Sequence, residues 1–150
     1  MSSADTPPTG VVNPEPLLSA FGFWPSFHDA EIHSAILDRG NEVEPPSITL
    51  VVHAFSCDGQ VDENGFFRVV TSVLVTLKCS DVRESELVDL GHQNVISSMG
   101  FESTAEGLVR LTLGECYGLS GSIVCSHVRI ESVVPWQYST PDRPPPSRRA

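Results

Sequence analysis

The sequence has few cations and no long apolar run, and each lack argues against a class of protein. Only one of its 150 residues is lysine, and 9 Lys and Arg stand against 19 Asp and Glu, which gives a formal charge of −10. A surface that binds nucleic-acid phosphates needs clustered Lys and Arg, so direct nucleic-acid binding is not expected. No apolar run approaches the about 18 residues of a membrane-spanning helix, so no membrane association is expected either.

The sequence also lacks the common signatures of export, metal binding and cofactor binding. Residues 1–5 have neither a basic cluster nor an apolar segment, so we expect no secretory signal and a cytoplasmic protein. The cysteines form no CxxC pair, which predicts reduced thiols and no structural zinc site: Cys57, Cys79, Cys116 and Cys125. GxSxG, GxGxxG and P-loop motifs are absent, so no cofactor is expected.

Proline divides the chain into a middle part and two ends. Eight of the 12 prolines lie in residues 1–16 and 139–150. Proline removes a backbone donor and disfavours helices and sheet ladders, so both segments are predicted to be flexible tails. Residues 17–138 then form a single domain, and they carry 6 basic and 16 acidic residues. Such an acidic domain suits a basic partner, although acidity also serves solubility.

Alternating polar and apolar residues in the middle part predict β-strands. The segments with this pattern, several of them rich in β-branched residues, are Ala30–Leu37, Ile48–Phe55, Phe67–Cys79, Val109–Leu113 and Val124–Val134, with a short extended piece at Gly100–Glu102. One polar and one apolar face favour antiparallel pairing. The predicted fold is mostly β, with an antiparallel sheet of five to six strands, curled or sandwich-like, and one short helix.

Two connecting segments have recognisable turn or cap residues. Asp58-Gly59 and Asn64-Gly65 are turn dipeptides, which predict a hairpin with an acidic loop of roughly ten residues between the second and third strands. Ser85 could cap a short helix that runs through Leu90.

The densest cluster of reactive side chains is Trp24–His33. An enzyme, either a hydrolase or a metal-dependent one, could use His28 as a general base with Asp29 and Glu31 nearby, but no nucleophile is evident. The simpler interpretation is that His28 and Asp29 hydrogen-bond backbone groups in a turn. A metal site would draw on His28, Glu31, His33 and His53, although His28 has the wrong strand parity; no metal is therefore expected.

A third class of function is a generic ligand-binding β-domain. Its binding surface would be a concave sheet face that carries Arg68, His127 and Arg129. Trp24 and Phe27 fit two roles, because large aromatic residues either seal the end of a core or anchor a partner protein.

Three stretches together resemble one known family. They are Phe21–Ile32 (FGFWPSFHDAEI), Gln93–Ile96 (QNVI), and Gly118–Ile123 (GLSGSI) leading to Val134-Pro135. Their order and spacing are similar to those of the immunity protein 50 family of bacterial polymorphic toxin systems. The resemblance implies a non-enzymatic cytoplasmic protein that binds a cognate toxin and neutralises it, for which a basic nuclease is one fitting partner. It assigns no catalytic residue and leaves the oligomeric state open.

The resemblance also divides the candidate residues into two groups. Its hallmark is Trp24, Pro25, Phe27, His28, Asp29 and Glu31. A motif shared by proteins that face different toxins is more plausibly structural, so toxin contacts are expected in the acidic loops instead. The candidates there are Asp58, Asp62, Glu63, Glu102, Glu106 and Glu115.

Overall fold

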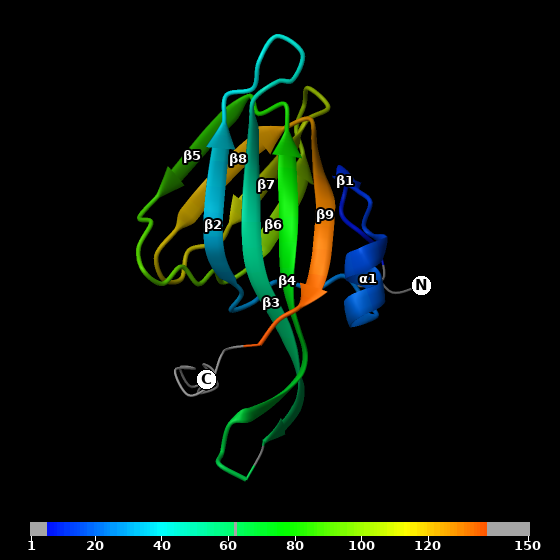
Figure 1. Cartoon of the computed structure of the whole chain (residues 1–150), viewed down its shortest axis with the longest axis vertical. Helices are drawn as coiled ribbons and strands as arrows, with labels where there is room; N and C mark the ends of the chain where they lie inside the picture. Colours follow the sequence, from blue (N-terminus) through cyan, green and yellow to red (C-terminus); the bar gives the residue numbers. More distant parts are fainter. Residues whose placement is uncertain (1–5, 62, 138–150) are drawn as a thin grey trace.

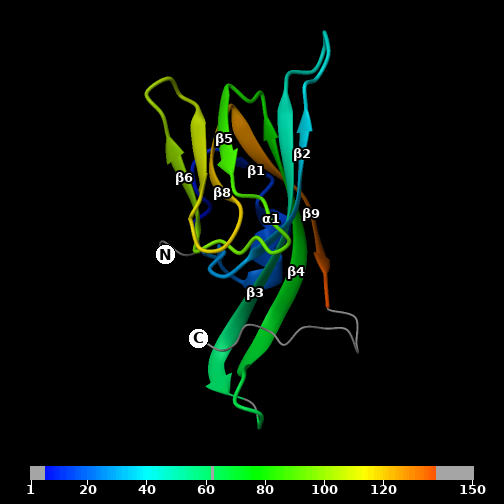
Figure 2. The ribbon, with the colours of Figure 1, turned by 90° about the vertical axis from the view of Figure 1, so that its left-hand side faces the viewer.

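The computed structural model describes residues 6–61 and 63–137, and it shows a sandwich of two β-sheets. Figures 1 and 2 show the two sheets face to face, with one hairpin that projects well beyond them. The described residues form nine strands and one helix. The predicted fold class, mostly β with antiparallel pairing and one short helix, is confirmed; the tail predicted at 139–150 lies outside the described residues.

The first sheet has five strands in the order β1-β9-β4-β3-β2. Its strands are β1 (Val11–Val12), β2 (Glu31–Asp38), β3 (Ser47–Val61), β4 (Phe67–Ser80) and β9 (His127–Pro135). All neighbours are antiparallel except β1, which runs parallel to β9. The first three predicted strands therefore correspond to β2, β3 and β4, which form the centre and one edge of this sheet.

The second sheet has four antiparallel strands in the order β5-β8-β7-β6. Its strands are β5 (Glu84–Val88), β6 (Met99–Ser103), β7 (Val109–Leu113) and β8 (Ser120–Cys125). The helix predicted at Ser85–Leu90 is wrong, because this segment forms the edge strand β5. Its side chains are mostly exposed, so they show no clear apolar alternation.

The single helix among the described residues is α1 (Glu15–Phe21), which the sequence analysis did not predict. Leu17 and Phe21 are its buried side chains, and Gly22 ends it in the left-handed region with an N–H bond to Leu18 O of 2.7 Å. Residues 6–16, which we assigned to a tail, contain β1 and the start of α1. No helix in 6–61 and 63–137 has the length and hydropathy to cross a membrane.

The chain crosses between the sheets at two adjacent points, Asp81 and Ser126. Ser126 Oγ donates to Asp81 Oδ2 (2.7 Å), and Ser126 N–H donates to Ser80 O (2.9 Å). Arg83 also donates to Asp81 Oδ2 (2.8 Å). The bonds from the Arg83 and Ser126 side chains hold the pKa of Asp81 below its usual value. The single strand predicted at Val124–Val134 is therefore divided at Ser126, since its first part belongs to one sheet and its second part to the other.

The facing sides of the two sheets form one apolar core. Its fully buried side chains include Leu50, Leu77, Leu111, Ile123 and Ile130. The thiols of Cys79 and Cys125 are buried, and the neighbouring Cys125 thiol together with burial raises the pKa of Cys79. Among the described residues, none of the four cysteines forms a disulfide.

The hairpin of β3 and β4 is longer than either neighbouring strand. The acidic loop predicted to span roughly ten residues is mostly strand, because β3 extends to Val61 and β4 starts at Phe67. Strand β2 pairs with β3 only as far as His53, and β9 pairs with β4 only as far as Val73. We call residues 55–72 the arm (Figures 1 and 2); Ser72 at its base still bonds to Trp136, and the strand residues beyond it extend past these neighbours.

Candidate functional site

Residues 26–30 of the hallmark motif form a tight turn that leads into β2. Ala30 N–H donates to Phe27 O (3.0 Å), and both Phe27 and Asp29 have a positive φ, of 64° and 63°. Such a conformation is unfavourable for a bulky residue, so surrounding contacts must hold it. The Phe27 side chain is 3% exposed, within the core, and its burial supplies one such contact.

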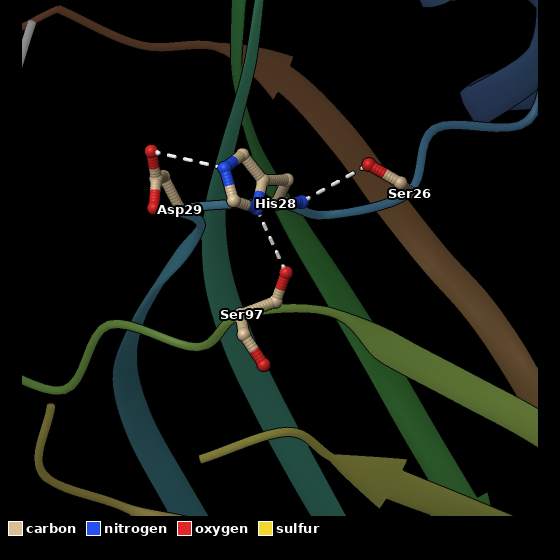
Figure 3. A network of polar contacts seen from close by, with 4 residues as sticks. All are labelled: Ser26, His28, Asp29 and Ser97. Carbon is tan, nitrogen blue, oxygen red and sulfur yellow. Dashed lines mark hydrogen bonds and ion pairs between the residues drawn. The ribbon is translucent and has the colours of Figure 1, made fainter. Parts of the chain in front are cut away.

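His28 and Asp29 point outward from this turn (Figure 3). His28 Nδ1 lies 3.0 Å from Ser97 O, and His28 N–H donates to Ser26 Oγ at 3.2 Å. His28 Nε2 lies 3.5 Å from Asp29 Oδ2. Because a carbonyl oxygen only accepts, Nδ1 must carry a proton. Both ring nitrogens thus face oxygen acceptors, which fits a turn held to the neighbouring loop better than a general base.

The turn and the start of β2 are bonded to the segment 94–99, which overlaps the second family stretch. Asp29 N–H donates to Ile96 O (3.0 Å), and Ile96 N–H donates to Ala30 O (2.9 Å). Ile32 N–H donates to Asn94 O (2.8 Å). These bonds link the edge of the first sheet to the β5–β6 loop of the second sheet.

The third stretch completes this connection. Val95 and Tyr117 exchange two backbone hydrogen bonds, of 2.7 and 3.0 Å. Asn94 is buried, and its Oδ1 accepts from Leu119 N–H at 3.0 Å. A Cβ on Gly118 would lie 2.6 Å from Asn94 Oδ1, so only glycine fits there without displacement. The three family stretches therefore form one continuous set of backbone contacts, which we call the seam: residues 26–32, 94–99 and 117–119.

The aromatic and proline residues of the motif pack under the seam. Pro25 and Phe27 are buried, whereas Trp24 is half-buried. The Trp24 ring meets the edges of Phe27 and Phe101 at centroid distances of 6.2 and 5.9 Å. These contacts place Trp24 at the margin of the core.

A match to a family model establishes which family the chain belongs to. The model described as Immunity protein 50 matches residues 13–136. The chain belongs to the immunity protein 50 family. Searches of curated proteins and of solved structures found no match. The match to the immunity protein 50 model covers the seam, the arm and every strand except β1, so these parts belong to the family domain.

One feature of this immunity protein 50 domain was missed by the sequence analysis. His33, His53, Phe55 and Trp136 gather on the outer face of the first sheet, where the arm begins. The ring of Trp136 lies 4.9 Å from that of His33 and 4.4 Å from that of His53, between centroids. His53 is 6% exposed, and burial followed by the charge of His33 lowers its pKa to about 4. Trp136 comes from the end of the domain, so no local pattern indicated this cluster.

The acidic candidates do not form one patch. Glu63 is exposed at the tip of the arm, Asp58 lies on β3 with its side chain outside the described part, and Asp62 is outside the described residues. Glu115 lies in the β7–β8 loop, next to the seam. Glu102 is on β6, and its Oε1 lies 3.7 Å from Arg110 Nε. Glu106 lies in the β6–β7 turn, which is at the end of the sandwich opposite the arm (Figures 1 and 2).

The structure does not assemble the alternative metal site. Glu31 and His53 are register partners and His33 lies close by, but His28 lies apart in the turn. Within the described residues, no group of three His, Cys, Asp or Glu could hold a metal ion.

The residues proposed for a ligand-binding face are also separated. Arg129 is the register partner of Lys78 and forms an ion pair with Glu131 (3.2 Å). Arg68 lies on the arm, ten residues earlier along β4, which corresponds to about 33 Å of strand. One small ligand cannot contact both arginines.

Proposed function

We propose that this protein binds a cognate toxin and neutralises it by covering the toxin's active site, without catalysis of its own. The observation that carries this proposal is the match of the immunity protein 50 model to residues 13–136. Within this proposal the protein acts in the cytoplasm of the cell that makes the toxin.

The geometry of the motif supports a scaffolding role for its residues. His28, Asp29 and Asn94 are engaged with backbone groups that hold the seam together. A hydrolase would need His28 to face a nucleophile, whereas its two nitrogens face Ser97 O and the Asp29 carboxylate. Recognition of the toxin therefore belongs to surfaces outside the motif.

The charge of the chain supports a basic partner. A formal charge of −10 raises the rate of encounter with a cationic surface and disfavours binding to anions. A nuclease must carry a cationic surface where its substrate binds, so a nuclease domain is the toxin class that fits best. Occlusion by a rigid domain needs about 800 Å² of surface on each partner.

Co-expression with the toxin domain encoded next to this gene tests the proposal. We expect cells that carry both proteins to survive, and the purified pair to form a stable complex in which toxin activity is lost. A His28→Ala variant serves as the control for chemistry, because an occluding protein keeps its protection when this imidazole is removed and the fold is retained. Unchanged killing by the toxin, or loss of protection by a folded His28→Ala variant, would contradict the proposal.

A further inference from the structure

We infer that the toxin is bound through the arm, by strand pairing between an edge of the β3–β4 hairpin and an extended segment of a basic toxin domain. This inference rests on the proposed function and specifies the surface that performs it. The evidence is the position of the arm, its exposed side chains and its charge.

The arm is a two-stranded ribbon that continues after the core has ended. The last pair buried on both strands is Ala54 and Val73, which are 1% and 6% exposed. Among the described residues, no third strand pairs with residues 55–61 of β3 or 67–71 of β4. A ribbon without flanking strands offers two edges to which a partner strand can add, and an isolated hairpin of this kind is only marginally stable.

Apolar side chains are exposed along the described part of the arm. Val61 and Val70 are 57% and 61% exposed, and Val69 is 38% exposed. Residues 55–72 contain no proline and no lysine, which are the residues that usually protect an open edge from pairing. The exposed valines beside these open edges supply apolar surface that a paired partner strand can cover.

Charge decides which partner is favoured. The arm carries Asp58, Asp62 and Glu63 against the single cation Arg68. A second copy of this chain would bring another −10 and like charges at its own arm, so pairing between two arms is opposed by repulsion. A cationic toxin domain gains attraction instead, and its apolar residues can cover Val69 and Val70.

The place where the arm leaves the sandwich allows further contacts. His53, at the base of the arm, is the register partner of Glu31, a seam residue and the first residue of β2. The arm projects from the end of the sandwich at which β2 begins (Figures 1 and 2). Tyr117, which is 62% exposed, lies in the seam through its bonds to Val95. A toxin domain paired with the arm can therefore also contact Tyr117, which lies outside the Trp24–Glu31 motif, and this contact adds to the area that it covers.

The test uses the full-length protein and its toxin domain. A Val61→Lys/Val70→Lys variant places two cations on the arm, and Val43→Lys is the matched control, because Val43 is 89% exposed in the β2–β3 loop at the opposite end. We expect the double variant to raise the Kd at least about tenfold, with the control within about twofold of the original protein. Circular dichroism and the melting temperature establish that each variant is folded.

Hydrogen exchange supplies a readout that is specific for strand pairing. Amide exchange in residues 67–71 or 55–61 should slow in the complex, because an added strand bonds to the backbone of the edge. Tight binding by the folded double variant, or no protection in either segment, overturns the arm as the binding element while the proposed function stands. Failure of the original protein to bind any toxin overturns both. A dimer of the free protein that the double variant dissolves also overturns the inference, since the occupant would be a second copy.

Discussion

Asn94 and Leu119 are joined by a hydrogen bond of 3.0 Å between the Asn94 side-chain oxygen and the Leu119 N–H. The same side chain also accepts from Gly91 N–H and donates to Gly91 O, both at 2.9 Å. One buried amide thus fixes two loops of the seam that are 25 residues apart.

Replacement of this amide should be costly. An Asn94→Ala substitution leaves the N–H groups of Gly91 and Leu119 without their acceptor, and we expect the free energy of unfolding to fall by about 2–4 kcal/mol. Gln93→Ala is the matched control, because Gln93 is exposed on the same loop and its loss should change stability by less than about 0.5 kcal/mol. Urea unfolding measures both variants, and equal stabilities would contradict the role of Asn94.

Alanine substitutions at Gly118 and Gly107 distinguish the cost of a strained backbone from the cost of a steric clash. Both have a positive φ, of 85° and 81°, but a Cβ on Gly107 meets nothing within 4 Å, whereas on Gly118 it meets Gln93 O and Asn94. Alanine at either position should cost about 1–2 kcal/mol for the left-handed conformation. Gly118→Ala should cost about 1–3 kcal/mol more, because the seam must open. Thermal unfolding that shows the same loss for both variants would disprove this close approach.

The buried imidazole of His53 predicts a dependence of stability on pH. Its pKa is about 4 in the folded protein, against a usual value of 6.5, so the unfolded state binds more protons between these pH values. Stability from this residue is therefore complete above pH 6.5 and is lost as the pH falls toward 4, by roughly 1–3 kcal/mol in total. The measurement is the difference in unfolding free energy between the original protein and His53→Gln at pH 7 and pH 4.5. If the difference stays constant, His53 does not titrate in this way.

Trp24 should contribute to stability rather than to toxin binding. Its half-buried ring contacts Phe27 and Phe101, and truncation to alanine should cost about 2–3 kcal/mol, at the lower end for a large aromatic residue. Phe23→Ala is a suitable control, because the Phe23 side chain is more exposed, at 39%. A Trp24→Ala variant with an unchanged melting temperature but weaker toxin binding would instead show that the ring is an anchor for the partner.

Two glutamates at opposite ends of the molecule test where the toxin approaches. Glu63→Lys at the tip of the arm should slow association several-fold at low salt, and the effect should shrink as salt is added. Glu106→Lys makes the same change of charge in the β6–β7 turn, away from the arm, so its effect should be much smaller. Stopped-flow or surface-binding kinetics compare them; an equal or larger effect of Glu106 would move the interface to the other end.

Strands with one buried face could be predicted from the sequence. Val109–Leu113 was predicted to the residue, and Phe67–Cys79 differs from β4 by one residue. Strand β5 was missed because it lies at an edge, where most of its side chains face water and carry no alternation. Helix α1 was missed because it follows Pro14 directly and is only 7 residues long. With two buried residues, it shows too few apolar positions for a helical periodicity to be recognised in the sequence.

The candidate site was predictable to a similar extent. The sequence drew attention to the motif residues, and the His28 side chain lies against a backbone carbonyl as interpreted, whereas the Asp29 side chain faces His28 and only its backbone N–H bonds to Ile96. The partners of these bonds, Ser97 and Ile96, could not be predicted, since they lie almost 70 residues away. The same holds for the contact of Trp136 with His53.

Most of the strands, the acidity and the family resemblance could be inferred from the sequence alone, because they depend on local alternation, on composition and on short motifs in a fixed order. Tertiary structure decided which segments become neighbours: that β2 and β9 stop before the hairpin ends, and that three distant stretches meet in one seam. The physical reason is that strand pairing and burial depend on contacts between residues far apart in the chain. A local pattern records that a side chain is buried, but not which strand lies beside it.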